Sequence, residues 1–341
     1  MNPPRPLAIT MGDAAGIGPE IIIKAFAAGQ AQDCVVVGDA QVIAAAAAGV
    51  DIPGALGSSV ARIEHMTQWQ NLPPGVIPVL QAHGLEPESL RDLVAGRVDA
   101  RAGAAAHAAI VTATHAALRG EVAAVVTAPI HKEALHAAGV PFPGHTELLQ
   151  HLAGGMPVRM MLANDELRTV LVTIHMSVRE ALDAVTFEAV LETLRITHLA
   201  AQRWGQPHPR LAVAGLNPHA GEGGLFGDEE IRILAPAIRQ ARAEGIDASG
   251  PHAPDTVFMR ARNTPGHAGE FDVVIAMLHD HGLIPVKYMG LDAGVNVTLG
   301  LPFVRTSPDH GTAFDLAGRG CANPASLVSA LAMARQLSRF A

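Results

Sequence analysis

The chain has 341 residues, of which 49% are apolar, 16% charged and 4% aromatic. This length and apolar fraction exclude an intrinsically disordered chain and predict a compact core built from Ala, Val, Leu and Ile. The formal net charge is -8, and Lys and Arg are spread singly along the chain. Without a basic block to neutralise a run of phosphates, nucleic acid is not an expected partner. The 17 histidines against one tyrosine direct attention to imidazole chemistry.

The two cysteines, Cys34 and Cys321, lie far apart in the sequence, so no disulfide framework is expected. The N-terminal residues Met1–Pro6 lack the apolar segment of a signal peptide. The longest apolar runs are also broken well before a membrane-spanning length. These features predict a reducing, cytoplasmic location and no membrane partner.

Short apolar runs alternate with helix-length segments along the whole chain. The expected buried strands are Leu7–Met11, Val35–Gly38, Val122–Thr127, Thr169–Ile174, Leu211–Leu216, Val273–Met277 and Val295–Leu299. The expected helices are Pro19–Ala28, Asp99–Leu118, Thr186–Trp204, Asp228–Glu244 and Pro324–Phe340, with the alanine run Ala44–Ala48 in a surface helix. This alternation predicts an α/β fold with a largely parallel sheet.

Two segments are interpreted as loops. Asp51–Ser59 is rich in Gly, Pro and Ser, and Gly250–Pro254 is a Pro-flanked turn before a helix. The N-terminal segment Met11–Glu20 contains a glycine-rich turn and a helix that starts near Pro19. Its spacing matches neither the G-x-G-x-x-G fingerprint nor a Walker loop, so it predicts a tight turn and no particular cofactor.

Three histidines, His175, His219 and His279, follow three of the expected strands. Function in such folds sits beyond the carboxyl ends of the strands, so three imidazoles are expected along one edge of the sheet. Neutral imidazole is a common metal ligand, and three of them leave a coordination position open for a substrate oxygen. Zinc, cobalt, nickel or iron suits such a site. The alternative for any one of these histidines is a hydrogen-bonded structural role.

Lys287, Asn296 and Arg305 recur at loops and strand ends after the third histidine. Lys supplies a point charge and Arg a bidentate fork, the pair that a phosphate or carboxylate clamp needs. In a chain with few cations this grouping predicts an anion site. The alternative is that both cations are ordinary solvated charges.

Two further segments combine a helix start with polar side chains. In Gly144–Glu147, Thr146 fits an N-cap, and the exposed N–H groups of a helix start attract anions. A capping role for Thr146 gives no reason for the neighbouring histidine, His145. Asp255 and Thr256 open another helix, where the Asp255 carboxylate either caps the helix or orients and supplements the metal ligands.

Five segments carry a resemblance to a known family: Ile9–Glu20, Gly144–Glu147, Leu216–Gly223, Pro254–Thr256 and Ala276–Ala317. Together they resemble the 4-hydroxythreonine-4-phosphate dehydrogenases of pyridoxal phosphate biosynthesis and their near paralogues. The segments span the chain from end to end in the expected order, and they are far more specific than a single glycine-rich loop.

The resemblance implies a two-lobed fold like the isocitrate and isopropylmalate dehydrogenases, with an active-site cleft between the lobes. The first expected lobe is 1–130 plus 305–341, and the second is 131–304. The resemblance also implies a homodimer with active sites shared between subunits. A divalent cation (zinc, cobalt or magnesium) is expected on His175, His219 and His279, one of them from the partner subunit, and NAD or NADP is the implied cofactor.

The matching positions also suggest roles. His145, Thr146, Lys287, Asn296 and Arg305 match the family's substrate-binding positions. The implied reaction is hydride transfer from the secondary hydroxyl of a small phosphorylated hydroxy acid to a nicotinamide, followed by decarboxylation of the β-keto acid. Lys287 is the candidate proton-transfer residue, with a plain charge clamp as the alternative.

Asp255, in a segment that also matches the family, is the second catalytic candidate. Three residues depart from the family pattern: Ala14 in place of Pro, His281 in place of Gln and Pro308 in place of Val. The order Ile284–Lys287 resembles paralogues that oxidise 4-phospho-D-threonate or 4-phospho-D-erythronate, so both types of substrate are carried forward.

Two other classes of protein fit the residues taken alone: a metal lyase or aldolase acting on a phosphorylated sugar acid, and a non-catalytic sensor of a phosphorylated metabolite.

Overall fold

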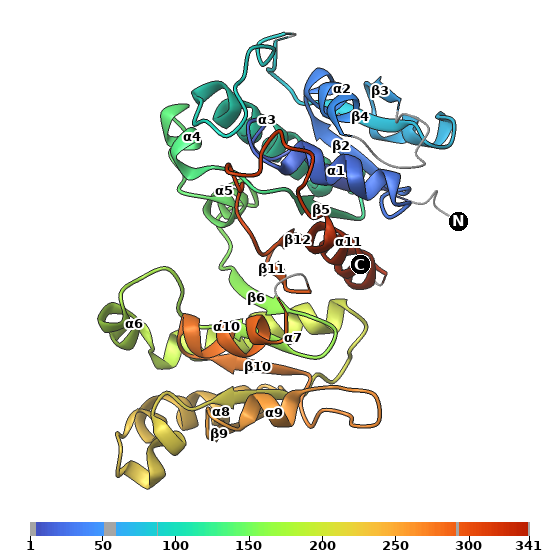
Figure 1. Ribbon diagram of the computed structural model, residues 1–341. Helices are drawn as coiled ribbons and strands as arrows, with labels where there is room; N and C mark the ends of the chain where they lie inside the picture. Colours follow the sequence, from blue (N-terminus) through green and yellow to red (C-terminus); the bar gives the residue numbers. More distant parts are fainter. Residues whose placement is uncertain (1–4, 51–58, 87, 291–292, 340–341) are drawn as a thin grey trace. The chain divides into compact units, whose positions relative to one another are not determined.

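The computed structural model describes residues 5–50, 59–86, 88–290 and 293–339. The chain forms two compact units, the first from residues up to Met156 together with Leu301–Arg339, and the second from Pro157–Gly300 (Figure 1). The lobe boundaries expected from the sequence differ, because residues 131–156 and 301–304 belong to the first unit. There α4 (Lys132–Ala137) and α5 (His145–Leu152) pack against α3 (Ala100–Leu118).

The first unit contains a parallel sheet in the order β3-β4-β2-β1-β5-β12. Its strands are β1 (Leu7–Thr10), β2 (Cys34–Gly38), β3 (Val60–Ile63), β4 (Ile77–Gln81), β5 (Ala124–Thr127) and β12 (Val304–Pro308). β1, β2 and β5 are buried along their whole length, which is why they are continuous apolar runs in the sequence. These three strands confirm the expected ones to within two residues at each end, whereas β3, β4 and β12 were not expected.

The helices of the first unit are α1 (Gly18–Ala27), α2 (Ala40–Gly49), α3, α4, α5 and α11 (Ala325–Ser338), with a 3-10 turn at Met66–Asn71. α3 packs on the sheet through small side chains. Ala109, Ala113 and Ala116 recur on one face of α3 and enter a hydrophobic cluster with Ala8 and Val125 of the sheet. The alanine run of the sequence therefore lies in a helix, α2, as expected.

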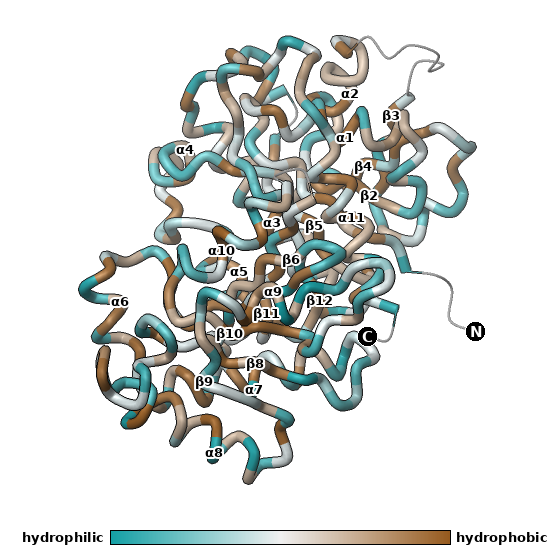
Figure 2. The backbone as a smooth tube through the Cα atoms, turned by 60° about the horizontal axis from the view of Figure 1, so that its bottom comes forward, coloured by the Kyte–Doolittle hydropathy of each residue, from teal (hydrophilic) through white to brown (hydrophobic). Residues whose placement is uncertain are grey.

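The second unit contains strands in the order β11-β6-β7-β10-β8-β9. They are β6 (Arg159–Ala163), β7 (Arg168–Leu171), β8 (Leu211–Ala214), β9 (Ala248–His252), β10 (Val273–Ala276) and β11 (Val295–Leu299). β7, β10, β8 and β9 are parallel, and β6 runs antiparallel to its neighbours β7 and β11. The trace is hydrophobic along β10, which is fully buried (Figure 2). The expected α/β class with a largely parallel sheet is confirmed.

The helices of the second unit are α6 (Val178–Ala184), α7 (Phe187–Arg203), α8 (Ala235–Ala243), α9 (Val257–Ala261) and α10 (His279–Tyr288), with a 3-10 segment at Pro218–Gly224. The expected helix Asp228–Glu244 is divided into a π turn, Glu230–Leu234, and α8. Pro236 lies at this junction and cannot donate a backbone hydrogen bond, which accounts for the irregular turn.

Two expected loops have different outcomes. The loop expected at Gly250–Pro254 is wrong in its first half, because residues 250–252 belong to β9. Pro251 is tolerated there because β9 is the last strand of its sheet and has one free edge. Of the loop expected at Asp51–Ser59, residues 51–58 lie outside the described residues.

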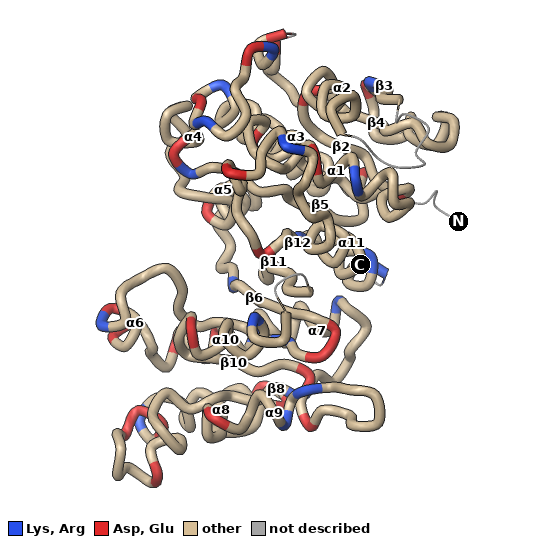
Figure 3. Tube along the Cα trace, in the orientation of Figure 1, with Lys and Arg blue, Asp and Glu red and all other residues tan. Residues whose placement is uncertain are grey.

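Charged residues are scattered along the trace, with Lys and Arg interspersed among Asp and Glu (Figure 3). Cys34 is buried, Cys321 is exposed, and both are free thiols. Within the described ranges, none of the helices has the length and apolar character needed to cross a membrane.

Candidate metal and substrate site

The carboxyl ends of three neighbouring strands in the second unit lead to the three predicted histidines. β10 lies between β7 and β8 and is parallel to both. His175 follows β7, His219 follows β8, and His279 follows β10 as the first residue of α10. The expectation that these three residues follow the same edge of one sheet is therefore confirmed at the level of the backbone.

His175 and His279 also come together as side chains. Their ring centroids lie 5.8 Å apart, with the planes tilted by 46°. A tetrahedral ion with metal–nitrogen bonds of about 2.0–2.1 Å would hold two ring centroids roughly 5 Å apart, so a small side-chain adjustment would fit this pair. Asp280 Oδ1 lies 2.8 Å from His279 Nδ1. A carboxylate in that position accepts from Nδ1–H and leaves Nε2 available to a metal ion.

The His219 side chain is turned to its own loop. Its Nδ1 lies 3.2 Å from Glu222 Oε2, its ring meets Phe226 edge-on at 6.3 Å, and 63% of the side chain is exposed. Across the part of the chain that the structure describes, no three His, Cys, Asp or Glu residues are grouped so that they could hold a metal ion. The pair of rings His175–His279 is therefore present within one chain, and metal binding by all three histidines stays a prediction.

The loop that carries His219 depends on Glu230, a residue that sequence reasoning missed. Glu230 is buried, and its Oε1 accepts hydrogen bonds from the backbone N–H of Leu216 at 2.8 Å and of Asn217 at 2.7 Å. Burial opposes ionisation of this carboxyl, but the hydrogen bonds from Asn217 and the backbone outweigh it and lower the pKa of Glu230. In the sequence Glu230 lies within an expected helix, so no signal linked it to His219.

In the first unit, two of the predicted substrate-binding residues, Arg305 and His145, lie near each other. Arg305 lies on β12, is only 3% exposed and donates from Nη2 to Thr127 Oγ1 at 2.6 Å. Burial lowers the pKa of Arg305 to about 10. Burial, followed by the positive charge of Arg305, holds the pKa of His145 well below its ordinary value. His145 is therefore neutral at physiological pH.

The Nε2 atom of His145 is buried and has no hydrogen-bond partner. An unsatisfied buried polar atom is costly, so such atoms in native proteins commonly await a ligand or water. Beside a buried guanidinium, the fitting ligand is an oxyanion, because it can accept hydrogen bonds from both groups. His145 and Arg305 thus lie near each other, and their substrate-binding roles stay predictions.

The other predicted residues are placed as follows. Thr146 does not cap α5, because the helix begins at His145 and its N-cap is Gly144, which has no side chain. Asp255 is exposed, and Thr256, the N-cap of α9, makes no capping hydrogen bond. The capping interpretation is therefore wrong at Thr146, and Asp255 keeps only its predicted catalytic role.

Lys287 and Asn296 both lie in the second unit and are half-buried. Lys287 is in the last turn of α10, the helix that starts at His279, so about 12 Å of helical rise separates the two residues. Asn296 lies on β11 opposite Leu162 of β6. Both therefore stand on regular elements of the unit that carries the histidine pair.

Asp13 and His131 were not predicted, yet both carry unsatisfied buried atoms. Asp13 follows β1, is 1% exposed and accepts from the Ala15 N–H through Oδ1 at 2.8 Å, while its Oδ2 has no partner. Burial raises the pKa of Asp13, although the Ala15 hydrogen bond and His131 oppose the shift. His131 follows β5, stacks on Phe314 at 4.5 Å and leaves Nδ1 unsatisfied. β1 and β5 are adjacent and parallel, so Asp13 and His131 follow neighbouring strand ends, while Arg305 lies within the next strand, β12, opposite Val125.

Comparison with known proteins gives consistent results. The family model described as "Pyridoxal phosphate biosynthetic protein PdxA" matches residues 30–334. A 4-hydroxythreonine-4-phosphate dehydrogenase of Beijerinckia indica is 54% identical over 335 residues, which cover 98% of this chain and 95% of the relative. A D-threonate 4-phosphate dehydrogenase of Salmonella typhimurium is 45% identical over 336 residues, covering 98% of this chain and 99% of that protein.

Solved structures match over the same extent. The crystal structure of a 4-hydroxythreonine-4-phosphate dehydrogenase from Klebsiella pneumoniae has a TM-score of 0.88 and 45% sequence identity, with 98% of each chain covered. The likeness therefore extends over both units.

Proposed function

Because the chain belongs to the PdxA family of pyridoxal phosphate biosynthetic proteins, we propose that it is a metal-dependent dehydrogenase that oxidises a 4-phosphorylated 3-hydroxy acid with NAD or NADP. The proposed substrate is of the 4-phosphohydroxy-L-threonine type, and the β-keto acid that forms then loses carbon dioxide. The observation that carries the proposal is the His175–His279 pair beside Asp280, in a chain whose relatives are dehydrogenases of this kind.

The residues of the first unit would bind the anionic part of the substrate. Arg305 would donate to a phosphate or carboxylate oxygen, with Thr127 holding one of its guanidinium nitrogens. The neutral His145 would donate or accept a hydrogen bond at Nε2 without adding a second buried positive charge. Thr146, in the same first turn of α5 as His145, would also bind the substrate.

The residues of the second unit would act at the hydroxyl group. His175, His219 and His279 would hold a divalent cation such as zinc, cobalt or magnesium. When bound, the cation lowers the pKa of the substrate hydroxyl, and the nicotinamide accepts the hydride. Lys287 would supply or receive the proton, and Asp255 would orient the groups around it.

We further propose a homodimer in which one histidine ligand comes from the partner subunit. Within its own chain, the His219 side chain contacts Glu222 and Phe226 of its own loop. Large apolar side chains are exposed beside the histidine segments: Met176, Val178, Leu225 and Phe226 are 46%, 67%, 72% and 50% exposed. Exposed large apolar side chains of this kind are often covered by another protein surface.

A second substrate type follows from the relatives. The protein at 45% identity from Salmonella typhimurium is a D-threonate 4-phosphate dehydrogenase, so 4-phospho-D-threonate is an alternative substrate for the same chemistry. 4-Phospho-D-erythronate, which the order Ile284–Lys287 suggests, is proposed with it. The lyase or aldolase alternative receives no such support, because the relatives described above are dehydrogenases.

The proposal is tested by following NADH or NADPH formation from the three phosphorylated acids, before and after treatment with a chelator. The expected result is turnover of one of them, loss after chelation and recovery when zinc, cobalt or magnesium is restored. Release of carbon dioxide in step with the reduced nucleotide would accompany oxidation of the proposed acid. Absence of turnover with all three acids, or turnover that chelation does not change, would contradict the proposal.

A further inference from the structure

The second unit contains a cavity of about 310 Å³ that none of the predicted site residues lines. Arg168 begins β7, Arg210 immediately precedes β8 and Asp272 immediately precedes β10, so the cavity lies at the amino ends of three neighbouring parallel strands. The predicted histidines follow the carboxyl ends of the same strands, and the four residues of β7 alone separate the two ends by about 10 Å. The cavity is therefore distinct from the candidate metal site.

The walls of this cavity are largely polar. They are formed by the turn between β6 and β7, the residues that lead into β8 and the loop before β10. The amide side chains of Asn164, Gln206 and Asn263 line it beside charged groups, and Phe271 adds an aromatic surface. The volume is at the lower end of the roughly 300–1,000 Å³ that is typical of small-molecule sites. The cavity therefore suits a small polar ligand.

Two of the three carboxylates that line the cavity are already paired. Asp272 accepts from Arg210 at both oxygens, from Nη2 at 3.0 Å and from Nε at 3.2 Å. Glu166 forms an ion pair with Arg262, which is not a lining residue. The third carboxylate, that of Asp165, is exposed and forms neither an ion pair nor a side-chain hydrogen bond with any residue that the structure describes. Asp165 is therefore available to a positively charged group.

Arg168 is the cation of the cavity that forms no ion pair with a described residue. It is half-buried, with Cζ 6.0 Å from the centroid of the Trp204 ring, and its Nη1 donates a long hydrogen bond of 3.5 Å to Gln206 Oε1. Burial lowers the pKa of Arg168, while Asp272 and Asp165 oppose the shift. A guanidinium stays charged in proteins and carries five N–H donors, so Arg168 retains donors for a negatively charged group.

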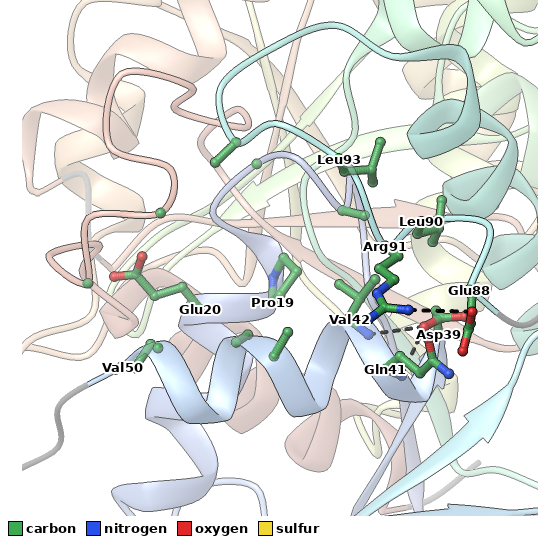
Figure 4. Close-up of a pocket in the computed structure, with 18 residues that line it drawn as sticks. Pro19, Glu20, Asp39, Gln41, Val42, Val50, Glu88, Leu90, Arg91 and Leu93 are labelled. Carbon is green, nitrogen blue, oxygen red and sulfur yellow. Dashed lines mark hydrogen bonds and ion pairs between the residues drawn. The ribbon is translucent and has the colours of Figure 1, made fainter.

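The cavity of the first unit does not offer this combination. Its volume is about 600 Å³, and Arg91 is the only Lys or Arg among its lining residues, all of which the structure describes. Figure 4 shows Arg91 paired with Glu88, at 3.7 Å, and Asp39 accepting from the Gln41 and Val42 N–H groups at 2.9 and 3.0 Å. The cation of that cavity is therefore already neutralised, whereas Arg168 is not.

We propose that the cavity of the second unit binds a small α-amino acid in its zwitterionic form. The ligand carboxylate accepts hydrogen bonds from the Arg168 guanidinium, and the ligand ammonium group donates to the Asp165 carboxylate. A simple anion would be repelled by Asp165 and a simple cation by Arg168, whereas a zwitterion is attracted by both. The amides of Gln206 and Asn263 favour a polar side chain on the ligand. This inference requires neither the metal nor the nicotinamide cofactor of the proposed function.

The first test compares three small probes by calorimetry on the purified protein. L-serine carries both charged groups, L-glycerate has a hydroxyl in place of the ammonium group, and ethanolamine lacks the carboxylate. We expect L-serine to bind at least roughly tenfold more tightly than either of the other two. Absence of L-serine binding overturns the proposal. Binding of L-glycerate as tight as that of L-serine also overturns it, because the cavity would then bind anions in general.

The second test changes the two charged groups one at a time. We expect Arg168→Gln and Asp165→Asn each to weaken L-serine binding by at least roughly tenfold. Asp165→Asn should not weaken binding of L-glycerate, because that probe has no ammonium group. Arg239→Gln and Asp183→Asn are the matched controls, since both residues are exposed in the second unit and neither lines the cavity. Unchanged L-serine binding in either cavity variant overturns the proposal.

Thermal unfolding separates loss of binding from loss of the fold. Substitution of the half-buried Arg168 can lower stability, whereas Asp165 is exposed in a turn, where Asn is well tolerated. Asp165→Asn should therefore keep its melting temperature and still lose L-serine binding, so this variant decides the question if Arg168→Gln does not fold. L-serine binding that responds to Asp165→Asn, in a protein that oxidises none of the phosphorylated acids, would retain this site and reject the proposed reaction. Turnover without L-serine binding would do the reverse.

Discussion

The imidazole rings of His175 and His279 lie 5.8 Å apart between centroids, although one follows β7 and the other begins α10. Their meeting depends on β10 being the direct neighbour of β7 in a parallel sheet. Asp280 beside His279 completes an arrangement of imidazoles and a carboxylate that orients one of them. The relationship leads directly to a test of metal binding.

Replacement of His279 should remove the metal. We expect His279→Ala to retain little zinc or cobalt after dialysis and to lose at least about 100-fold in activity, because a ligand is absent. Asp280→Asn should weaken metal affinity by a smaller factor, about 10–100-fold, since the carboxylate only orients the ring. His208→Ala, at an exposed histidine, is the control. Elemental analysis of the dialysed proteins checks this, and full metal content in His279→Ala would contradict it.

Sharing of the site between subunits predicts complementation. His219→Ala and His279→Ala should each be inactive alone. Unfolding and refolding them together gives mixed dimers, in which one site has all three histidines if His219 comes from the partner subunit. Random pairing then restores up to about one quarter of the activity. No recovery in mixtures that size-exclusion and mass measurements show to be mixed dimers would place all three ligands in one chain.

The Arg305–Thr127 hydrogen bond should be needed for substrate binding. We expect Arg305→Lys to raise the KM for the phosphorylated acid about 10–100-fold, because hydrogen bonds to charged groups contribute about 1.5–3 kcal/mol. Thr127→Val removes the acceptor from a buried guanidinium, whereas Thr127→Ser keeps it. Steady-state kinetics should therefore give Thr127→Ser a KM close to that of the unaltered protein and Thr127→Val a clearly higher KM. Equal KM values for the two Thr127 variants would count against this role.

The lowered pKa of His145 predicts a loss of stability in acid. The folded protein holds this imidazole neutral, while the unfolded chain protonates it near its ordinary value of about 6.5. Its contribution to stability is therefore complete above that pH and is lost as the pH falls towards the folded-state pKa. His145→Gln should show a shallower decline in the free energy of unfolding between neutral and acidic pH. His136→Gln, at an exposed histidine, should decline as the unaltered protein does, and equal slopes for all three would contradict the prediction.

Glu230 should act as a positioning residue for the His219 loop. Glu230→Ala leaves the buried Leu216 N–H without its acceptor and should lower the free energy of unfolding by about 1–3 kcal/mol. Metal affinity should fall as well, because the loop is no longer held, and Glu230→Gln, which keeps one acceptor oxygen, should recover part of it. Glu229→Ala, which loses a single contact with Asn217 Nδ2, is the control. Unchanged metal affinity in Glu230→Ala would mean that Glu230 stabilises the fold but does not position the His219 loop for metal binding.

Much of the fold could be predicted from local patterns. β1, β2 and β10 are continuous apolar runs because both faces of a parallel sheet are covered, and that pattern is visible without any partner strand. Strands such as β3 were missed because they are only partly buried and their sequences lack such a run. The expected lobe boundary at 130/131 differed because packing of α5 on α3 joins residues that local sequence does not relate.

Part of the candidate site could also be predicted from the sequence, and part could not. The chain order of strand and histidine determined that His175, His219 and His279 would follow one sheet edge, since parallel strands end together. Only the tertiary structure decided that His279 meets His175 while His219 contacts Glu222, and that Arg305 is buried against Thr127. Those contacts depend on which strands become neighbours and how each loop turns. Residue types and their spacing in the sequence do not give the distance in space between segments that are remote in the chain. They therefore cannot specify such contacts.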